Sequence, residues 1–206
     1  MDSLSDVLAG YATIFYTLFM TYLQDLIQRR RSVYPKMYDP GKPIDRALIE
    51  QLLEAARWAP THRMTEPWRF HVFHSETARR SLGQYLVSYY EQHAPERGLS
   101  EEKRHKMLEN PVRAGAVIAL CMQRDPLGSV PEWEEIAAVA CAVQNMWLLC
   151  TEWNLGCYWS TPEAMTGRPD ILNLAPGERC LGLFYAGWHS SPVAPAKRNP
   201  VVVSWL

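Results

Sequence analysis

The segment that decides the fold is "WEEIAAVACAVQNMWLLCTEWNLG", residues 133–156. After its first turn this segment is apolar nearly all round, which predicts a helix that is buried on most of its sides. We expect the helix to end at Gly156, because glycine is common just beyond a helix C-terminus. A sheet must then pack around this central helix.

The segments on either side read as alternating helices and strands. "IDRALIEQLLEAARWA" (residues 44–59) has the apolar spacing of a helix, and "WRFHVFHS" (residues 68–75) has the alternation of a strand. Two apolar runs, residues 114–122 and 178–188, are short enough to be buried strands. Together these elements predict an α+β fold, a sheet-and-helix sandwich around a central apolar helix.

Shorter segments complete the expected outline. We expect a short strand or turn at residues 157–160 and a short helical piece at residues 162–174. Residues 76–113 are polar and mixed in charge, with Pro95 and Gly98 as breakers, so they predict two surface helices that could cover a site as a lid. The Pro-rich tail, residues 189–206, cannot be helical and should run extended over another surface.

Composition excludes several classes of function. The 206 residues suffice for one compact core, and 21 Lys plus Arg against 22 Asp plus Glu give no net field that would attract nucleic acid. The five cysteines form no CxxC motif and are odd in number, which argues against a disulfide framework or a structural zinc and favours a reducing, cytoplasmic setting. His71 and His74 would face opposite sides of a strand, so we interpret both as structural and expect no metal site.

The N-terminal segment has two interpretations. Residues 7–24 contain no charged residue and fall at the lower edge of the length needed to span a bilayer. They also contain Gly10 and several Tyr and Thr, and no positive region precedes them as in a signal peptide. We favour a helical extension, residues 1–27, packed on the body or on a second subunit, with membrane association as the alternative. Residues 28–206 would then form the main domain.

The junction "RWAPTHRMTEPWRF", residues 57–70, joins the predicted helix to the predicted strand. Its tryptophans and prolines could form a packed corner, which is a purely structural role. Alternatively, Pro60 fixes a turn that presents Thr61 and His62 as hydrogen-bonding groups to a flat polar ring.

Basic residues close the first helix and recur in the tail. Arg29, Arg30, Arg31 and Ser32 are consecutive, and Lys197 and Arg198 lie near the C-terminus. These side chains are suited to a phosphate, but a helix C-terminus also favours cations without any ligand.

Four motifs in order resemble the nitroreductase family of flavoproteins, most in detail its small, short-chain branch. They are "RRSVYPKMY" (30–38), "ARWAPTHRMTEPWRF" (56–70), "NLGCYWSTP" (154–162) and "LGLFYAGWHSSPVAPAKRNP" (181–200). The likeness extends from about Gln28 to the C-terminus. It implies a dimer with two FMN sites at its interface, ping-pong hydride transfer from NADPH or NADH, and a nitroaromatic, quinone or related small-molecule acceptor.

The resemblance also implies a role for individual residues. The phosphate and ribityl contacts are Arg30, Arg31, Ser32 and Arg198. The turn that reaches the isoalloxazine of the partner subunit is Pro60, Thr61 and His62, and the turn on the other side of the ring is Trp159, Ser160 and Thr161. We expect His62 to donate toward N1–C2=O of the flavin, and we expect no dedicated catalytic side chain.

Three positions depart from the family pattern. A lysine often found after the Ser is Tyr34 here, the common Asn of the junction is Met64, and the usual Gln before Pro-Trp is Glu66. The phosphate site therefore has one cation fewer than in some members, and Glu66 could repel an anionic pyrimidine edge. These changes put the affinity for FMN in question more than the fold.

Two other functions remain open at this point. The iodotyrosine-deiodinase-like branch is similar in "TEPW" and "KRNP", and would use Tyr90, Glu91 and Lys103 or Lys106 to hold a zwitterionic amino acid. A flavin-storage or ligand-sequestering protein would keep the same fold without turnover.

Overall fold

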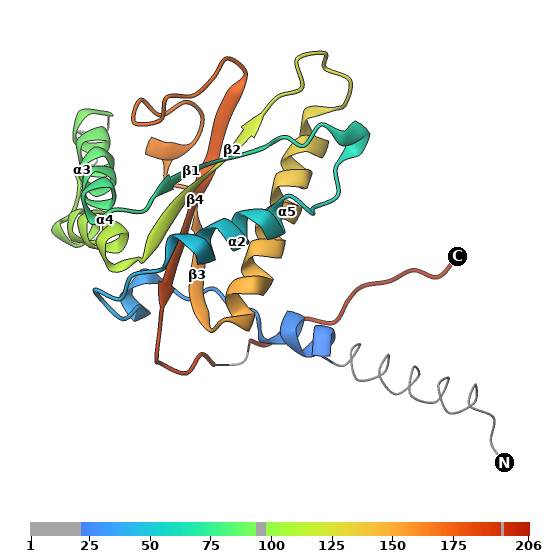
Figure 1. The fold of residues 1–206 in the computed structure, drawn as a ribbon, viewed down its shortest axis with the longest axis horizontal. Coiled ribbons are helices and arrows are strands. Elements are labelled where there is room, and N and C mark those ends of the chain that lie inside the picture. The colour runs from blue at the N-terminus through green and yellow to red at the C-terminus, as the bar shows by residue number, and fades with distance from the viewer. Residues whose placement is uncertain (1–21, 94–97, 195) are drawn as a thin grey trace.

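A computed structural model of the protein describes residues 22–93, 98–194 and 196–206. The central element is an antiparallel four-stranded sheet with helices on both of its faces (Figure 1). In spatial order the strands are β1 (Trp68–Phe73), β2 (Ala116–Gln123), β4 (Glu178–Trp188) and β3 (Leu155–Ser160). The strands expected from sequence are confirmed, and the short segment at residues 157–160 belongs to β3.

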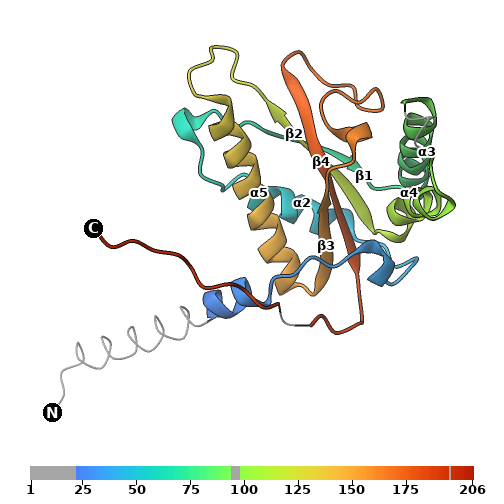
Figure 2. The same ribbon diagram turned by 180° about the vertical axis from the view of Figure 1, so that it is seen from behind.

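The helices form two layers, one on each face of the sheet (Figures 1 and 2). α2 (Arg46–Ala56) and α5 (Glu132–Glu152) cover one face, and α3 (Glu76–His93) and α4 (Glu101–Arg113) cover the other. Three short 3₁₀ helices connect them: η1 (Pro35–Met37), η2 (His62–Met64) and η4 (Glu163–Met165). Of the helical piece expected at residues 162–174, only η4 (Glu163–Met165) is helical.

β2 shows why the middle of the sheet is apolar. Val117, Ala119 and Cys121 face the α3–α4 layer, whereas Ile118 and Leu120 face the α2–α5 layer. A strand covered on both faces has no side that water can reach, so its sequence reads as a continuous apolar run.

α5 differs from its prediction in two respects. One side, which includes Ala138, Val139, Ala142 and Met146, packs on the sheet, but the opposite side is exposed in the single chain. That exposed side carries small or polar residues, namely Ala137, Ala140, Cys141 and Gln144. The expectation of burial on most sides is therefore not met within one chain.

The end of α5 is also corrected, because the helix stops at Glu152 and not at Gly156. Asn154, with φ of 57°, takes the left-handed position beyond the helix end, which asparagine tolerates better than most residues. Gly156 instead lies in β3, where an added Cβ would be 2.8 Å from the ring of Tyr38 and 2.9 Å from Val33.

The two surface helices predicted in residues 76–113 are confirmed as α3 and α4. Ser100 caps α4 by accepting a hydrogen bond from the backbone N–H of Lys103 at 3.3 Å. Pro95 lies outside the described residues, and Gly98 immediately follows that gap.

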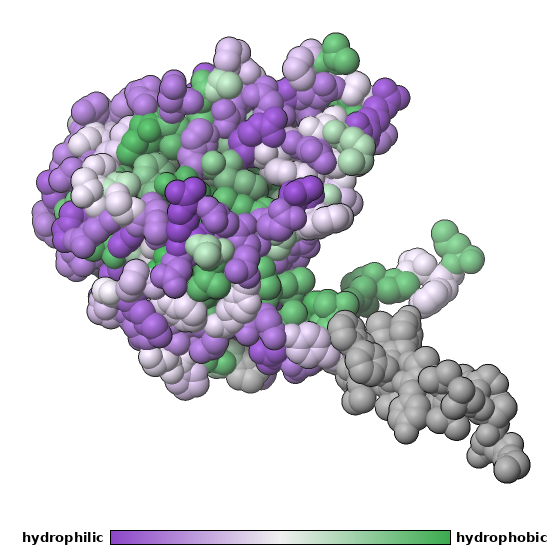
Figure 3. All heavy atoms as spheres, viewed as in Figure 1, coloured by the Kyte–Doolittle hydropathy of each residue, from purple (hydrophilic) through white to green (hydrophobic). Residues whose placement is uncertain are grey.

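The helical segment of residues 22–29 and the start of the C-terminal tail lie near the C-terminal end of α5 (Figure 1). Residues 22–29 are helical, and the rest of the candidate membrane segment, residues 7–21, lies outside the described residues. Within the part of the chain that is described, no helix has the length and apolar character to cross a bilayer. The described residues of the tail, 189–194 and 196–206, have no regular secondary structure, as predicted, but the tail does not run over another surface in the single chain, because Val201–Val203 are exposed and the end of the tail extends away from the body (Figure 3).

Candidate functional site

Three guanidinium groups gather at the C-terminal end of α5. Arg31 and Arg198 line one cavity, and Arg30 precedes Arg31; burial lowers the pKa of Arg30, and repulsion from Arg198 and Arg31 lowers it further. Arg30 also lies over the ring of Trp147, with its guanidinium carbon 4.8 Å from the ring centroid. Among the described residues, none of the three arginines pairs with a carboxylate. A cluster of this kind is suited to an anion with more than one charge.

Backbone contacts hold Arg31 within this cluster. Its guanidinium donates to the carbonyl of Gln28 at 2.5 Å and, more weakly, to that of Ala194 in the tail at 3.4 Å. The indole N–H of Trp147 in turn donates to the carbonyl of Arg31 at 3.0 Å. Arg31 and Arg198 line a cavity of about 940 Å³ between the first helix and the tail. The exposed Ser32 follows directly in sequence, and Arg29 lines the same cavity but is paired with Asp25 at 2.6 Å.

The junction at the other end of α5 is a strained turn. Arg63, Met64 and Glu66 have φ of 51°, 53° and 41°, a region that costs a residue other than glycine roughly 1–3 kcal/mol. The hydroxyl of Thr61 holds the turn, since it accepts from the backbone N–H of Glu66 at 3.2 Å and lies 3.1 Å from the hydroxyl of Thr65. Strain of this kind is common in segments that contact ligands.

The same turn is open to solvent. Pro60 and His62 are exposed, and Trp58 and Met64 are each 73% exposed. The packed-corner interpretation is therefore wrong for Trp58 and Pro60, although Trp68 and Pro67 are buried. The indole N–H of Trp58, just beyond the end of α2, donates to the carboxylate of Glu54 at 3.0 Å.

The side chain of His62 is oriented by a contact with α5. Its Nδ1 lies 2.5 Å from a carboxylate oxygen of Glu134, in the first turn of α5. When the imidazole is neutral, this contact puts the proton on Nδ1, because a carboxylate can only accept. Nε2, the other nitrogen, can then accept a hydrogen bond but donates one only when the ring is protonated.

The basic cluster and the turn thus lie at opposite ends of α5. Thirteen residues separate Glu134, which contacts His62, from Trp147, which contacts Arg30 and Arg31, and this is about 20 Å along a helix axis. One chain does not bring together the two sets of residues that the sequence assigns to one ligand.

The third predicted set lies at the end of β3 and is not wholly a turn, because Trp159 and Ser160 belong to the strand and only Thr161 follows it. Trp159 packs toward the α5 layer, whereas its neighbour Ser160 faces the α3–α4 layer, and Thr161 is exposed. The indole N–H of Trp159 is buried and has no acceptor within the described chain. A Cβ on Gly182 would come within 2.6 Å of this nitrogen, so only glycine leaves room for the indole there. A buried donor without a partner is uncommon in a folded protein.

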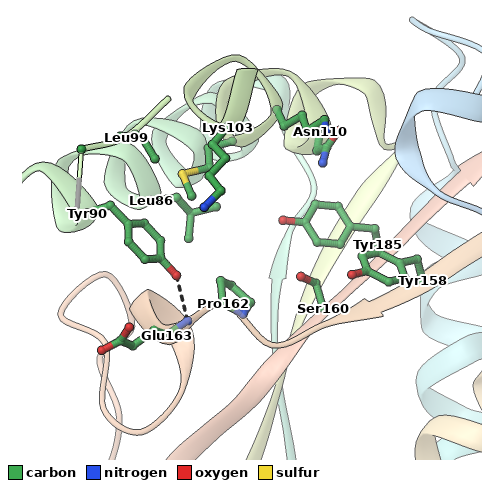
Figure 4. Close-up of a pocket in the computed structure, with 13 residues that line it drawn as sticks. Leu86, Tyr90, Leu99, Lys103, Asn110, Tyr158, Ser160, Pro162, Glu163 and Tyr185 are labelled. Atoms are coloured by element: carbon green, nitrogen blue, oxygen red, sulfur yellow. Dashed lines mark hydrogen bonds between the residues drawn. The ribbon is translucent and has the colours of Figure 1, made fainter. Parts of the chain in front are cut away.

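A pocket of about 590 Å³ lies between α3, α4 and the sheet (Figure 4). Its lining combines polar groups with apolar walls: Leu86, Tyr90, Leu99, Lys103, Lys106, Met107, Asn110, Tyr158, Ser160, Pro162, Glu163 and Tyr185. The helices expected to act as a lid therefore do form one wall of a pocket. Tyr34 connects the pocket to the N-terminal segment, since its ring centroid is 4.7 Å from that of Tyr158.

The predicted lid residues divide into two groups. Tyr90 and Lys103 reach the pocket, whereas Glu91 pairs with Arg104. Lys106 lines the pocket but pairs with Glu102 at 2.5 Å. Sequence reasoning missed Asn110 and Tyr185, which come from separate elements and carry no local motif.

A separate cluster joins three strands. Nε2 of His71 lies 2.9 Å from the carboxylate of the buried Glu178, and their ligand atoms lie within 4.8 Å of the Cys121 thiol. Burial alone would raise the pKa of Glu178, but hydrogen bonds from His71 and from the backbone N–H of Ala175 outweigh this and lower it. His74 contacts the carbonyl of Ile44 at 2.8 Å. Both histidines therefore have structural partners, as interpreted from sequence.

Comparisons with known proteins identify the same fold. Residues 27–188 match the model of the nitroreductase family. The chain is 27% identical to YfhC of Bacillus subtilis (strain 168), a provisionally assigned NAD(P)H nitroreductase, over 87% of this chain and 90% of YfhC. A solved nitroreductase-like family protein from Bacillus cereus has a TM-score of 0.68 and 26% identity, covering 86% of this chain and 90% of that one.

Two more distant structures were solved with flavin. A nitroreductase with bound FMN from Bacteroides fragilis NCTC 9343 has a TM-score of 0.67 and 20% identity, covering 89% of this chain and 97% of that one. An iodotyrosine deiodinase bound to FMN and 3-iodo-L-tyrosine has a TM-score of 0.62 and 20% identity, covering 89% and 98%. At these identities the likeness establishes the fold alone, and the predicted α+β, nitroreductase-like fold is confirmed.

Proposed function

The chain belongs to the nitroreductase family, and on that premise we propose that it is an FMN-dependent NAD(P)H oxidoreductase whose flavin lies between two copies of the chain. The observation that carries the proposal is the cluster of Arg30, Arg31 and Arg198, which has no carboxylate partner among the described residues. Three such charges are stable together when an anion such as the FMN phosphate neutralises them.

Residues of β3 would form the part of the site that holds the flavin ring. The hydroxyl of Ser160 would line one side of the isoalloxazine, whereas the neighbouring Trp159, whose indole packs on the opposite face of the sheet, would not share that side. The ring of Tyr34 packs against that of Tyr158 in β3, with their centroids 4.7 Å apart. The residues present therefore fit a molecule with an anionic tail and a flat polar ring.

The remaining contacts, Pro60, Thr61 and His62, would come from the second copy. A two-fold axis across the middle of α5 places the N-terminal end of one helix beside the C-terminal end of the other. The exposed side of α5, with Ala137, Ala140 and Cys141, lets two helices approach closely because these residues are small. The exposed tail at Val201–Val203 would cover the partner, since apolar side chains gain stability when they leave water.

Bound FMN would supply hydride and electron transfer between NADH or NADPH and a small acceptor. The arginines would hold the phosphate, and the end of β3 would orient the ring. His62 would act through Nε2 at the N1–C2=O edge, where a protonated imidazole donates and stabilises negative charge. Glu134 fixes the orientation of that imidazole through Nδ1. α3 and α4 would limit the access of water to the ring.

The alternative as a deiodinase-like enzyme has weaker support. A zwitterionic amino acid needs a carboxylate to receive its ammonium group. Glu91, the carboxylate assigned to that role, is paired with Arg104. We therefore favour an acceptor without an ammonium group. A flavin-storage protein would share the site but would not oxidise NADPH in the presence of a quinone or nitroaromatic acceptor.

The direct test is the spectrum of the purified protein together with its preference among flavins. We expect a yellow protein that releases FMN on denaturation. We also expect the apoprotein to bind FMN at least tenfold more tightly than riboflavin, which has no phosphate for the arginines to hold. Equal affinity for the two flavins, or none for either, would contradict the proposal.

A further inference from the structure

We infer that the pocket between α3, α4 and the sheet selects aromatic acceptors that carry an anionic group such as a carboxylate. This rests on the proposed function, because Ser160, which lines the pocket, is also expected to line the flavin. It goes beyond that function in naming which acceptors the pocket takes and which residue selects them.

Hydrogen-bond donors converge in this pocket. Figure 4 shows the ammonium of Lys103 and the side chains of Asn110, Tyr185 and Ser160 directed into one space from the helices on one side and the sheet on the other. These groups come from α4, β4 and the end of β3, and no two of them are adjacent in sequence. A convergent set of donors is typical of a site for an anion.

Two tyrosine hydroxyls of the pocket lining, those of Tyr90 and Tyr185, are available as donors. The hydroxyl of Tyr90 accepts from the backbone N–H of Glu163 at 3.0 Å, so its own proton is left to donate. Burial raises the pKa of Tyr185, and the neighbouring Tyr158 raises it further. The Tyr185 hydroxyl therefore keeps its proton at neutral pH and can donate it.

The positive charge of Lys103 is not balanced within the pocket. Lys103 forms no ion pair with any residue that the structure describes, whereas its neighbour Lys106 is paired with Glu102. Glu163 contributes to the lining, but Figure 4 shows its carboxylate directed away from Lys103 and Tyr185. A bound anion would supply the missing negative charge.

The walls of the pocket favour a flat apolar body for the ligand. Leu86, Leu99, Met107 and Pro162 supply aliphatic and thioether surface, and Tyr158 adds an aromatic face. The volume of about 590 Å³ is within the usual range for a small-molecule site. The whole lining therefore fits an aromatic ring with a carboxylate better than an uncharged quinone or an amino acid.

The test compares two acceptors that differ in charge and little in shape. With FMN-loaded protein and NADPH, or NADH if only that donor is used, kcat/KM is measured for 4-nitrobenzoate and for 4-nitrobenzamide. We expect the acid to be preferred by about tenfold or more, mainly through KM, as for a charge-assisted hydrogen bond. Lys103→Met should bring the acid-to-amide ratio close to one, and Lys103→Arg should restore most of it. Lys36→Met, on the exposed η1, should keep the wild-type ratio.

The result can overturn the inference independently of the proposed function. A wild-type ratio near one, a ratio unchanged by Lys103→Met, or loss of FMN from Lys103→Met would contradict it, the last because the lysine would then serve the cofactor. Equilibrium dialysis of benzoate against benzamide gives the same comparison without turnover. If the protein holds no FMN but binds benzoate through Lys103, the proposed function is wrong and the anion pocket is supported. If the FMN-loaded protein reduces charged and uncharged acceptors equally well, the proposed function is supported and the anion pocket is wrong.

Discussion

The two ends of α5 are alike in being exposed and unlike in how they would recognise a ligand. The C-terminal end offers charge, in the form of three arginines with no carboxylate partner among the described residues. The N-terminal end offers shape, as a strained turn held by Thr61 with His62 fixed by Glu134. Each end lacks what the other has. In the proposed function these ends are two half-sites, one for a phosphate and one for a ring, which a second copy would bring together.

The largest effect should come from keeping the two copies apart. Ala140 lies on the exposed side of α5, so Ala140→Arg would place a long charged side chain in the proposed helix–helix contact. We expect a monomer by light scattering and a loss of FMN affinity of more than about 100-fold, because both half-sites lose their complement. Thr77→Arg, on exposed α3 across the sheet, is the matched control and should leave both properties unchanged. A flavin-loaded monomer of Ala140→Arg would disprove the two-copy site.

A smaller effect should follow from weakening the charged end alone. Arg30→Ala or Arg198→Ala removes one charge-assisted contact to the phosphate, which corresponds to roughly 1.5–3 kcal/mol, or about 10- to 150-fold in Kd for FMN. Fluorescence titration of the apoprotein measures the change. Arg80→Ala removes an exposed arginine that pairs only with Glu76 on its own helix, and it should change nothing. The affinity for riboflavin should fall much less, and an equal loss for both flavins would contradict the phosphate role.

The turn at the other end should affect the flavin's reduction potential more than its affinity. His62→Ala removes the donor expected at N1–C2=O, so reduced, anionic flavin loses stabilisation and the midpoint potential should fall by about 30–60 mV. Glu134→Gln should cause a part of this shift, because the imidazole loses its anionic partner. His105→Ala, on the exposed surface of α4, serves as the control in dye-coupled redox titration. A potential and affinity unchanged in His62→Ala would show that this residue does not face the ring.

The smallest effect on FMN binding should come from a substitution in the cluster of His71, Cys121 and Glu178, which joins three strands. Glu178→Gln removes a buried carboxylate that accepts from His71 and Ala175, and it should cost about 1–3 kcal/mol in the free energy of unfolding at pH 7. Because the folded pKa of Glu178 is lowered, its stabilisation is full above the usual value for Glu, about 4.3, and is lost as the pH falls through the folded pKa. Urea titrations of both proteins at pH 7 and at stepwise lower pH should show the difference shrinking below about pH 4. A difference independent of pH would contradict the role of the ionised carboxylate, and FMN affinity should not change.

Much of the fold can be predicted from local sequence. β2 and β4 are recognisable because a strand covered on both faces needs an uninterrupted apolar run, and α3 and α4 because polar helices keep one apolar side. α5 is harder, because its apolar composition predicts burial on most sides, whereas one of its sides is exposed in the single chain. The helix end predicted at Gly156 is wrong because this glycine serves another purpose: its lack of a Cβ makes room for the ring of Tyr38.

The candidate site is less predictable than the fold. Arg30, Arg31 and Ser32 form a local motif, but Arg198 joins them only through the path of the tail. The separation of His62 from the arginines cannot be read from a motif, because it depends on which end of α5 each segment meets. Lys103 and Tyr185 converge through long-range packing, which leaves no spacing pattern in the sequence.

The central claim is that each flavin is held by residues of two chains, and mixed dimers test it most directly. The measurement is FMN content per dimer for doubly tagged dimers of Arg30→Ala and Pro60→Trp, each of which alone should purify with little flavin. With the substitutions on different chains, we predict one intact site and about one FMN per dimer, because one chain keeps its arginines and the other keeps its turn. With both substitutions on one chain and none on the other, we predict almost no FMN. The opposite pattern, flavin only when both substitutions share a chain, would show that each site is built within a single copy.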